Sequence, residues 1–120
     1  MNILLKIFLI LLTLDAIFIY NMKNLFNKQI FEVQGSYITP NFLGVILSYF
    51  FIMVQLYWFI IKDKRSVLDS FILGASLYGV YEYTNLALLK NWNIETTVID
   101  TIWGGCLFAI TTYIINNNIV

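Results

Sequence analysis

Hydrophobic residues fall into four long runs along this chain, and polar stretches separate them. A helix needs about 20 mainly apolar residues to cross a hydrocarbon core of roughly 30 Å. Runs of about this length occupy residues 3–20, 42–61, 67–89 and 97–115. The pattern therefore predicts four membrane-spanning helices.

The connections between these runs indicate how the helices are arranged. The connection at residues 21–41 is polar and contains the only proline, Pro40, whereas those at 62–66 and 90–95 are short. Short connections make successive helices antiparallel neighbours. Strands are not expected, because an open sheet cannot satisfy its edges in lipid and the runs lack the alternation of a barrel. The sequence predicts an all-α fold, with residues 1–120 forming a single transmembrane domain, an integral membrane four-helix bundle in antiparallel, up-down-up-down order.

The first run could instead be a cleaved signal peptide, since Lys6 stands at the start of an apolar stretch. Asp15 interrupts that stretch, however, and no small-residue cleavage pattern precedes Asn21. We expect the first helix to be retained.

Composition supports a membrane environment and excludes several classes of function. Hydrophobic residues make up 60% of the chain and charged residues 12%, against roughly 45–50% and about 25% in ordinary globular proteins. The formal net charge is zero, so no electrostatic field would attract nucleic acid. The expected surroundings are the lipid bilayer, with the chain as a multi-pass protein.

Cysteine and histidine usage narrows the chemistry further. The chain has one cysteine, Cys106, and no histidine, so an internal disulfide, a zinc site and histidine acid–base catalysis are not expected. We interpret Cys106, beside Gly104 and Gly105, as a small packing residue rather than a catalytic or lipid-modified thiol. No cofactor is predicted.

Basic residues give an expected orientation. Three of them lie within residues 62–65, directly at a helix end, with Lys6 inside the first helix on the same face. The opposite face would carry Lys23, Lys28 and Lys90. Because cytoplasmic loops carry an excess of Lys and Arg, both termini are predicted to be cytoplasmic.

Aromatic residues fall both near the predicted helix ends and deep within the helices. Trp92 lies near an end and fits an interfacial aromatic belt. Tyr49, Tyr78 and Tyr81 lie deeper. A buried tyrosine hydroxyl usually needs a hydrogen-bond partner, so partners are expected inside the bundle.

Three acids, Asp15, Glu82 and Asp100, interrupt the apolar runs. A charge at the centre of a membrane helix costs about 2.5–3.5 kcal/mol on insertion scales, and such residues tend to face the bundle interior and mark function. Antiparallel packing would bring all three toward the same membrane face, opposite the basic cluster at residues 62–65. The sequence therefore predicts an acidic site in one leaflet.

Neighbouring polar and aromatic residues complete this candidate site. Residues three or four apart share a helical face, which places Asn85 with Glu82 and with Tyr81, and Trp103 with Asp100. The predicted binding residues are Asp15, Tyr81, Glu82, Asn85, Asp100 and Trp103. No catalytic residue is assigned, and no particular metal is implied.

Three functions fit such a site. In the first, it binds or passes a small cation, a proton or a polar lipid head group, using carboxylate and amide oxygens and aromatic faces. Four helices form a thin wall, so transport would require a homo-oligomer. In the second, the acids only join helices, at about 0.6 kcal/mol per hydrogen bond. In the third, two carboxylates act as acid and base in a lipid-modifying enzyme. The chain has no nucleophile or cofactor motif, and we therefore favour a protein that is not an enzyme.

The stretch "YEYTNLALLKNWNIETTVIDTIWGG" at residues 81–105 resembles the signature of a family of small predicted membrane proteins, the domain of unknown function 2177 family. The "LDAIFIY" stretch at residues 14–20 is similar to another element of that family. The matching residues are Leu14, Asp15, Tyr81, Glu82, Thr84, Asn85, Trp92, Asp100, Trp103 and Gly104.

The chain departs from the family pattern at a few positions. Phe18 stands where the family has tryptophan, Glu82 stands where aspartate is more usual, and a proline expected after the second helix is absent. The longer glutamate keeps the charge but changes its reach. The resemblance implies a four-helix integral membrane protein and no particular activity.

Overall fold

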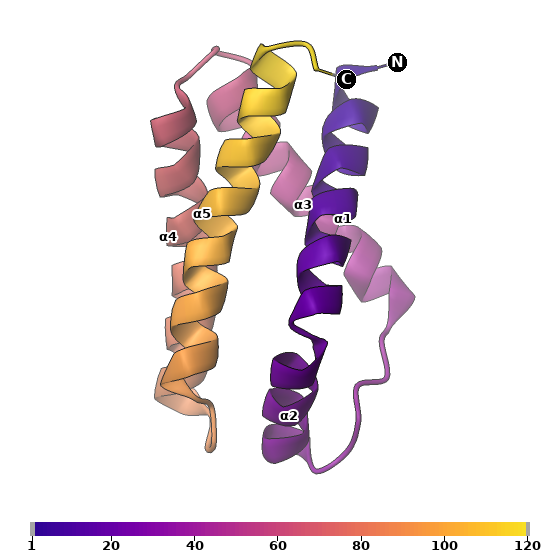
Figure 1. The fold of residues 1–120 in the computed structure, drawn as a ribbon, viewed down its shortest axis with the longest axis vertical. Coiled ribbons are helices and arrows are strands. Elements are labelled where there is room, and N and C mark those ends of the chain that lie inside the picture. The colour runs from indigo at the N-terminus through magenta and orange to yellow at the C-terminus, as the bar shows by residue number, and fades with distance from the viewer. Residues whose placement is uncertain (1, 120) are drawn as a thin grey trace.

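The computed structural model describes residues 2–119, and within them the chain is helical with no strand. The elements are α1 (Ile3–Asn21), α2 (Lys23–Gln34), α3 (Phe42–Leu56), the π-helical turn η1 (Tyr57–Ile61) that continues α3, α4 (Val67–Leu88) and α5 (Ile94–Asn116) (Figure 1). The all-α prediction is confirmed. Each hydrophobic run forms a helix whose bounds lie within three residues of those predicted.

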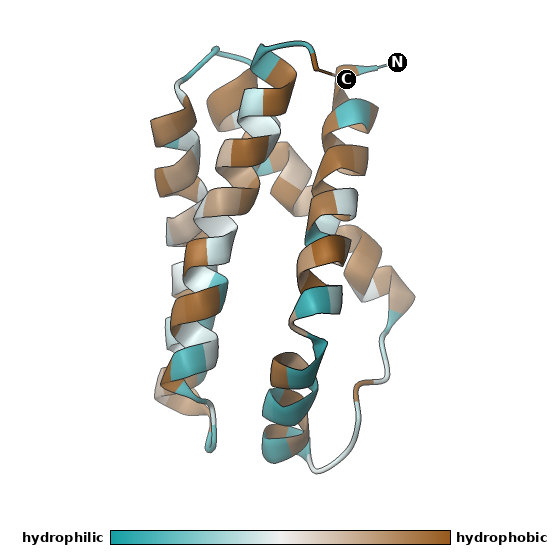
Figure 2. Ribbon diagram, in the orientation of Figure 1, coloured by the Kyte–Doolittle hydropathy of each residue, from teal (hydrophilic) through white to brown (hydrophobic). Residues whose placement is uncertain are grey.

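The connection at residues 21–41 differs from expectation, because much of it is a fifth helix. The backbone breaks at Met22, with φ −107° and ψ 13°, and α2 then runs to a left-handed cap at Gly35, with φ 76°. Glycine adopts that conformation without steric penalty, which explains the end of the helix. Figure 2 shows that α2 is mostly polar, below the apolar α1. A four-helix bundle therefore describes the architecture incompletely.

Three of the described helical segments are long and apolar enough to cross a membrane: Ile3–Asn21, Phe42–Ile61 and Ile94–Asn116. The segment predicted at residues 67–89 is not among them. Its helix, α4, contains small and polar residues, of which Ser70, Gly74 and Glu82 are buried. By length and composition, the structure thus supports three of the four predicted membrane spans. It does not establish α4 as the fourth.

Close backbone approach joins α4 to α5 along their length (Figure 1). A Cβ atom added at Gly74 would lie 2.2 Å from the carbonyl oxygen of Gly104, and one added at Gly104 would lie 2.3 Å from the ring of Tyr78. Ser70 strengthens the contact by donating from Oγ to the carbonyl oxygen of Phe108 at 2.9 Å. Only glycine fits at these two crossing positions.

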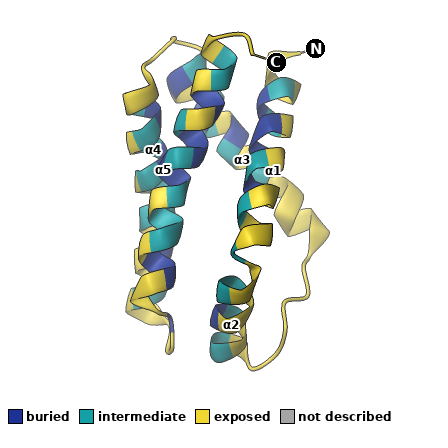
Figure 3. Cartoon of the chain, in the orientation of Figure 1, coloured by how far each residue is buried: buried dark blue, intermediate teal, exposed yellow. Residues whose placement is uncertain are grey.

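The hydrophobic core lies toward the end of the molecule that holds both described chain ends. Its fully buried members come from three helices and include Ile7, Leu11, Leu56, Leu107 and Phe108. At the other end α3 slants away from α1, and residues 41–48 are all exposed. Figure 3 shows this contrast between the buried and exposed halves of the molecule.

Candidate functional site

The three acids of the apolar runs, Asp15, Glu82 and Asp100, lie at equivalent distances from the ends of their helices. Asp15 lies six residues before the end of α1, Glu82 six before the end of α4, and Asp100 six after the start of α5. At 1.5 Å per residue this is about 9 Å from each helix end. All three ends lie near α2 (Figure 1). The acids therefore lie in the half of the molecule opposite the chain ends.

Asp15 connects three helices. Its side chain is 8% exposed. Its Oδ2 accepts a hydrogen bond from the hydroxyl of Tyr49 on α3, and its Oδ1 accepts one from Nε1 of Trp103 on α5 at 2.8 Å. Trp103 in turn stacks on Phe18, with ring centroids 4.4 Å apart. Tyr49 thus has the kind of interior partner expected for a deep tyrosine.

Glu82 is held from the turn between α4 and α5. Nε1 of Trp92 donates to Oε1 of Glu82 at 3.0 Å, and both residues are buried. The carboxyl group of Glu82 also lies close to that of Asp100. Trp92 was expected in an interfacial belt, and its bond to Glu82 could not have been foreseen, because it depends on the path of the turn.

A cleft of about 610 Å³ lies between α1, α3, α4 and α5. Its polar side chains include the carboxyl groups of Asp15 and Asp100 and the three tyrosines Tyr49, Tyr78 and Tyr81. The rest of its wall is mainly apolar and comes largely from α3. The arrangement puts two acids from different helices on the surface of one largely hydrophobic space.

The structure brings some of the six candidate binding residues together and separates others. Asp15, Asp100 and Tyr81 line the cleft, although Tyr81 is 59% exposed. Trp103 does not line the cleft, but it donates a hydrogen bond to Asp15, which does. Glu82 does not line the cleft either, and it lies close to Asp100. Asn85 stands apart: within the described residues its side chain makes no hydrogen bond, and its carbonyl accepts from the amide of Leu89.

The acids around the cleft have no basic partner among residues 2–119. The two ion pairs found there join Lys28 to Glu32 and Arg65 to Asp69, both on other surfaces. The same residues contain no group of three or more His, Cys, Asp or Glu side chains that could hold a metal ion. The cleft therefore offers two carboxyl groups without the dense ligand set of a protein metal site.

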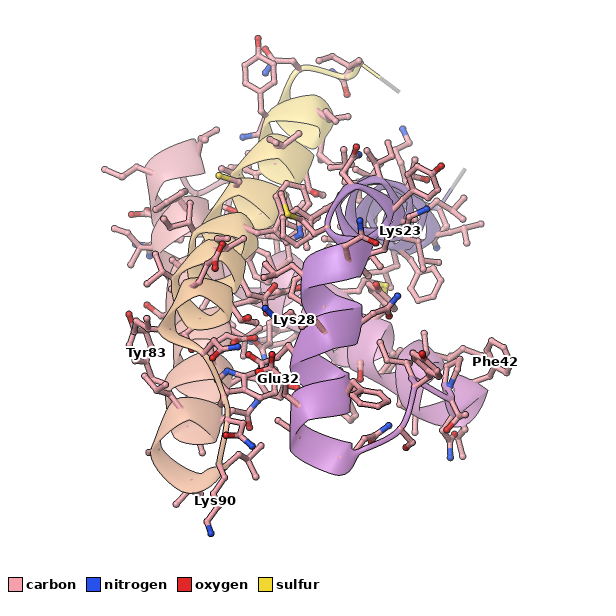
Figure 4. All side chains as sticks on the ribbon, turned by 60° about the horizontal axis from the view of Figure 1, so that its bottom comes forward. Lys23, Lys28, Glu32, Phe42, Tyr83 and Lys90 are labelled. Atoms are coloured by element: carbon pink, nitrogen blue, oxygen red, sulfur yellow. The ribbon has the colours of Figure 1, made fainter. Side chains whose placement is uncertain are left out.

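A second set of contacts links α2 to the polar end of α4 and α5. Gln29 is 1% exposed, and its side chain bonds to the backbone on both sides of Trp92. Its Nε2 donates to the carbonyl oxygen of Asn91, and its Oε1 accepts from the backbone amide of Asn93, each at 2.8 Å. Figure 4 shows this end, with Lys28 and Glu32 on α2 facing the turn that carries Lys90. No signal in the sequence singled out Gln29, because α2 itself was not expected.

The long apolar helices, packed through glycine and enclosing carboxyl groups, define a small helical membrane protein. The family described as "Predicted membrane protein (DUF2177)" matches residues 1–115, and the chain belongs to that family. This confirms the resemblance seen in the sequence motifs. Neither a curated protein nor a solved structure matches the chain significantly.

Proposed function

We propose that the cleft binds a positively charged ligand, with Asp15 and Asp100 supplying the opposite charge. The observation that carries this proposal is the pair of acids on an apolar wall without any basic partner among the described residues. A carboxylate in such surroundings is unfavourable unless a cation or a proton offsets it. A bound cation would supply that offset.

The chemistry of the cleft suits a cation in two further ways. A carboxylate has about four acceptor sites, and the two hydrogen bonds from Tyr49 and Trp103 leave Asp15 able to accept more while fixing its position. The rings of Tyr78 and Tyr81 also line the space. A cation over an aromatic face gains about 0.5–2 kcal/mol, most where water is excluded.

The proposal includes α4 as a fourth membrane span, antiparallel to α5. With 22 residues, α4 is long enough to cross. Its buried positions carry Ser70, Gly74 and Glu82, while apolar Leu68, Ile72 and Val80 are exposed. Polar groups that face a neighbouring helix need not meet lipid. Cytoplasmic termini, and an oligomer that would let the ligand cross the membrane, belong to the same proposal.

A structural role is the second candidate, and the bonds of Asp15 favour it. Its carboxyl group ties α1 to both α3 and α5, as helix-joining acids would. Interhelical hydrogen bonds in membranes contribute about 0.6 kcal/mol each. In this case the acids would hold the bundle together and the cleft would contain only lipid.

Thermal unfolding in lipid nanodiscs distinguishes the two roles. The wild type and Asp100→Asn are heated with a panel of cations: sodium, potassium, calcium, tetramethylammonium and dodecyltrimethylammonium. A ligand that binds only the folded state raises its stability by RT ln(1 + [L]/Kd). We expect at least one cation to stabilise the wild type and not Asp100→Asn.

The matched control is Asp63→Asn, which removes an exposed carboxyl group in the connection between η1 and α4. It should respond to the cation as the wild type does. If no cation separates Asp100→Asn from the wild type, cation binding is wrong and the structural role stands.

A further inference from the structure

We propose that the ligand of this cleft is an amphiphile that enters from the bilayer, with a cationic head at Asp15 and Asp100 and one apolar tail along α3. This inference rests on the proposed function and specifies the class of ligand. Three features of the cleft carry it: its size and walls, its incomplete set of oxygen ligands and the position of its mouth.

The size and walls of the cleft fit a ligand with an apolar part. Its volume of about 610 Å³ falls within the range of about 300–1,000 Å³ typical of organic ligand sites. The apolar residues of its wall are Ile19, Val45, Phe51, Ile52 and Leu77. A small inorganic ion would leave most of this surface without a partner, whereas a hydrocarbon tail would cover it.

The charged groups are too few for a bare metal ion. Calcium takes six to eight oxygen ligands, and magnesium retains several waters. Here the charged groups in the cleft are the two carboxyls of Asp15 and Asp100, and Asp15 already accepts two hydrogen bonds. An alkylammonium head needs only opposite charge and aromatic faces. Two carboxyls and the tyrosine rings meet that need.

The mouth of the cleft lies at the depth of a membrane span. Val45 and Phe51 line the cleft, are 38% and 59% exposed, and belong to the candidate span Phe42–Ile61. The cleft wall is therefore exposed along α3 within this span. A ligand already dissolved in the lipid could enter head first toward the acids.

The test uses a photoactivatable long-chain alkylammonium probe in nanodiscs that contain the wild-type protein, with labelled residues mapped by mass spectrometry. Three competitors are compared: dodecyltrimethylammonium, which has head and tail; dodecanol, which has only the tail; and tetramethylammonium, which has only the head. The first two are dosed as mole fractions of the lipid, so that general partitioning into the membrane does not mimic binding.

We expect the probe to label cleft residues and dodecyltrimethylammonium to compete at least about tenfold better than either partial ligand, equivalent to about 1.4 kcal/mol. If tetramethylammonium competes equally well, the site binds cations but the amphiphile inference is wrong. If dodecanol competes equally well, the charge is irrelevant and the proposed function also fails. Absence of cleft labelling overturns the inference.

Two matched variants test the location of the tail. Val45→Trp places a large side chain in the mouth, while Leu47→Trp adds the same bulk at an exposed position on α3 that does not line the cleft. Cleft labelling should fall about tenfold in Val45→Trp and stay unchanged in Leu47→Trp. Equal labelling in both variants would overturn the position assigned to the tail.

Discussion

Trp92 and Glu82 form a buried hydrogen bond across the turn between α4 and α5, from indole Nε1 to carboxyl Oε1 at 3.0 Å. The two residues are 9% and 2% exposed. The turn therefore does more than connect two helices, since it supplies the donor that holds an acid of α4. Asp100, whose carboxyl group lies close to that of Glu82, lines the cleft, so this bond also supports the candidate site.

We predict that Trp92→Phe destabilises the protein by about 1–3 kcal/mol, because it leaves a buried acceptor on Glu82 without its donor while preserving an aromatic ring. Unfolding by sodium dodecyl sulfate in mixed micelles measures the change. Trp58→Phe is the matched control, since Trp58 is 56% exposed, and it should cost much less. Similar losses from the two substitutions would show that the indole hydrogen bond contributes little.

Gln29 gives a second prediction, concerning the contact between α2 and the turn. Gln29→Ala removes both hydrogen bonds to the backbone of Asn91 and Asn93. We expect faster amide hydrogen exchange at residues 91–97, because the start of α5 loses its support. Gln34→Ala, at the exposed end of α2, is the control and should leave exchange in this region unchanged. Unaltered exchange in Gln29→Ala would mean that α2 does not hold the turn.

The glycines between α4 and α5 give a third prediction. Gly74→Ala would put a Cβ atom 2.2 Å from a backbone oxygen, so the helices must separate, and we expect a loss of about 1–3 kcal/mol. At Gly44 the nearest atom would be 3.9 Å away. Gly44→Ala should therefore be neutral or slightly stabilising, since alanine favours a helix. Unfolding in mixed micelles compares the pair, and equal stabilities would contradict the tight α4–α5 contact.

Four helical segments, α1, α3 with η1, α4 and α5, could be predicted from the sequence because each contains a long hydrophobic run. The common depth of Asp15, Glu82 and Asp100 follows from their positions within these hydrophobic runs once the helices alternate in direction. Small residues were less informative. Many glycines can allow close packing, and only the geometry shows that Gly74 meets Gly104 while Gly44 meets almost nothing.

The contacts at the polar end could not be predicted. The polar run at 23–34 resembles a loop by hydropathy, and its helix is supported by tertiary bonds through Gln29. Trp92 reaches Glu82 because the turn places Asn91 at φ 64°, a conformation that asparagine adopts more readily than most residues. Asn85 shares a helical face with the acids in the sequence pattern, yet it lies outside the cleft.

The membrane topology is the fourth prediction, and it decides whether α4, with Glu82, lies inside the bilayer. If α4 crosses, the connection at residues 62–66 and the turn at Lys90 face opposite sides. Asp63→Cys and Lys90→Cys, both exposed positions, are introduced separately into a Cys106→Ser background and labelled in intact cells with a membrane-impermeant thiol reagent. We expect Lys90→Cys to react from outside and Asp63→Cys to react only after permeabilisation, because the basic cluster should be cytoplasmic.

The reverse pattern would overturn the predicted orientation and leave the fourth span intact. Labelling of both cysteines from one side would show that α4 does not cross. The cleft would then lose the part of its wall that comes from α4, namely Leu77, Tyr78 and Tyr81, from the hydrocarbon region. This result would overturn the cleft as an intramembrane site enclosed by four helices, and it depends on neither a ligand nor the stability of a variant at the site.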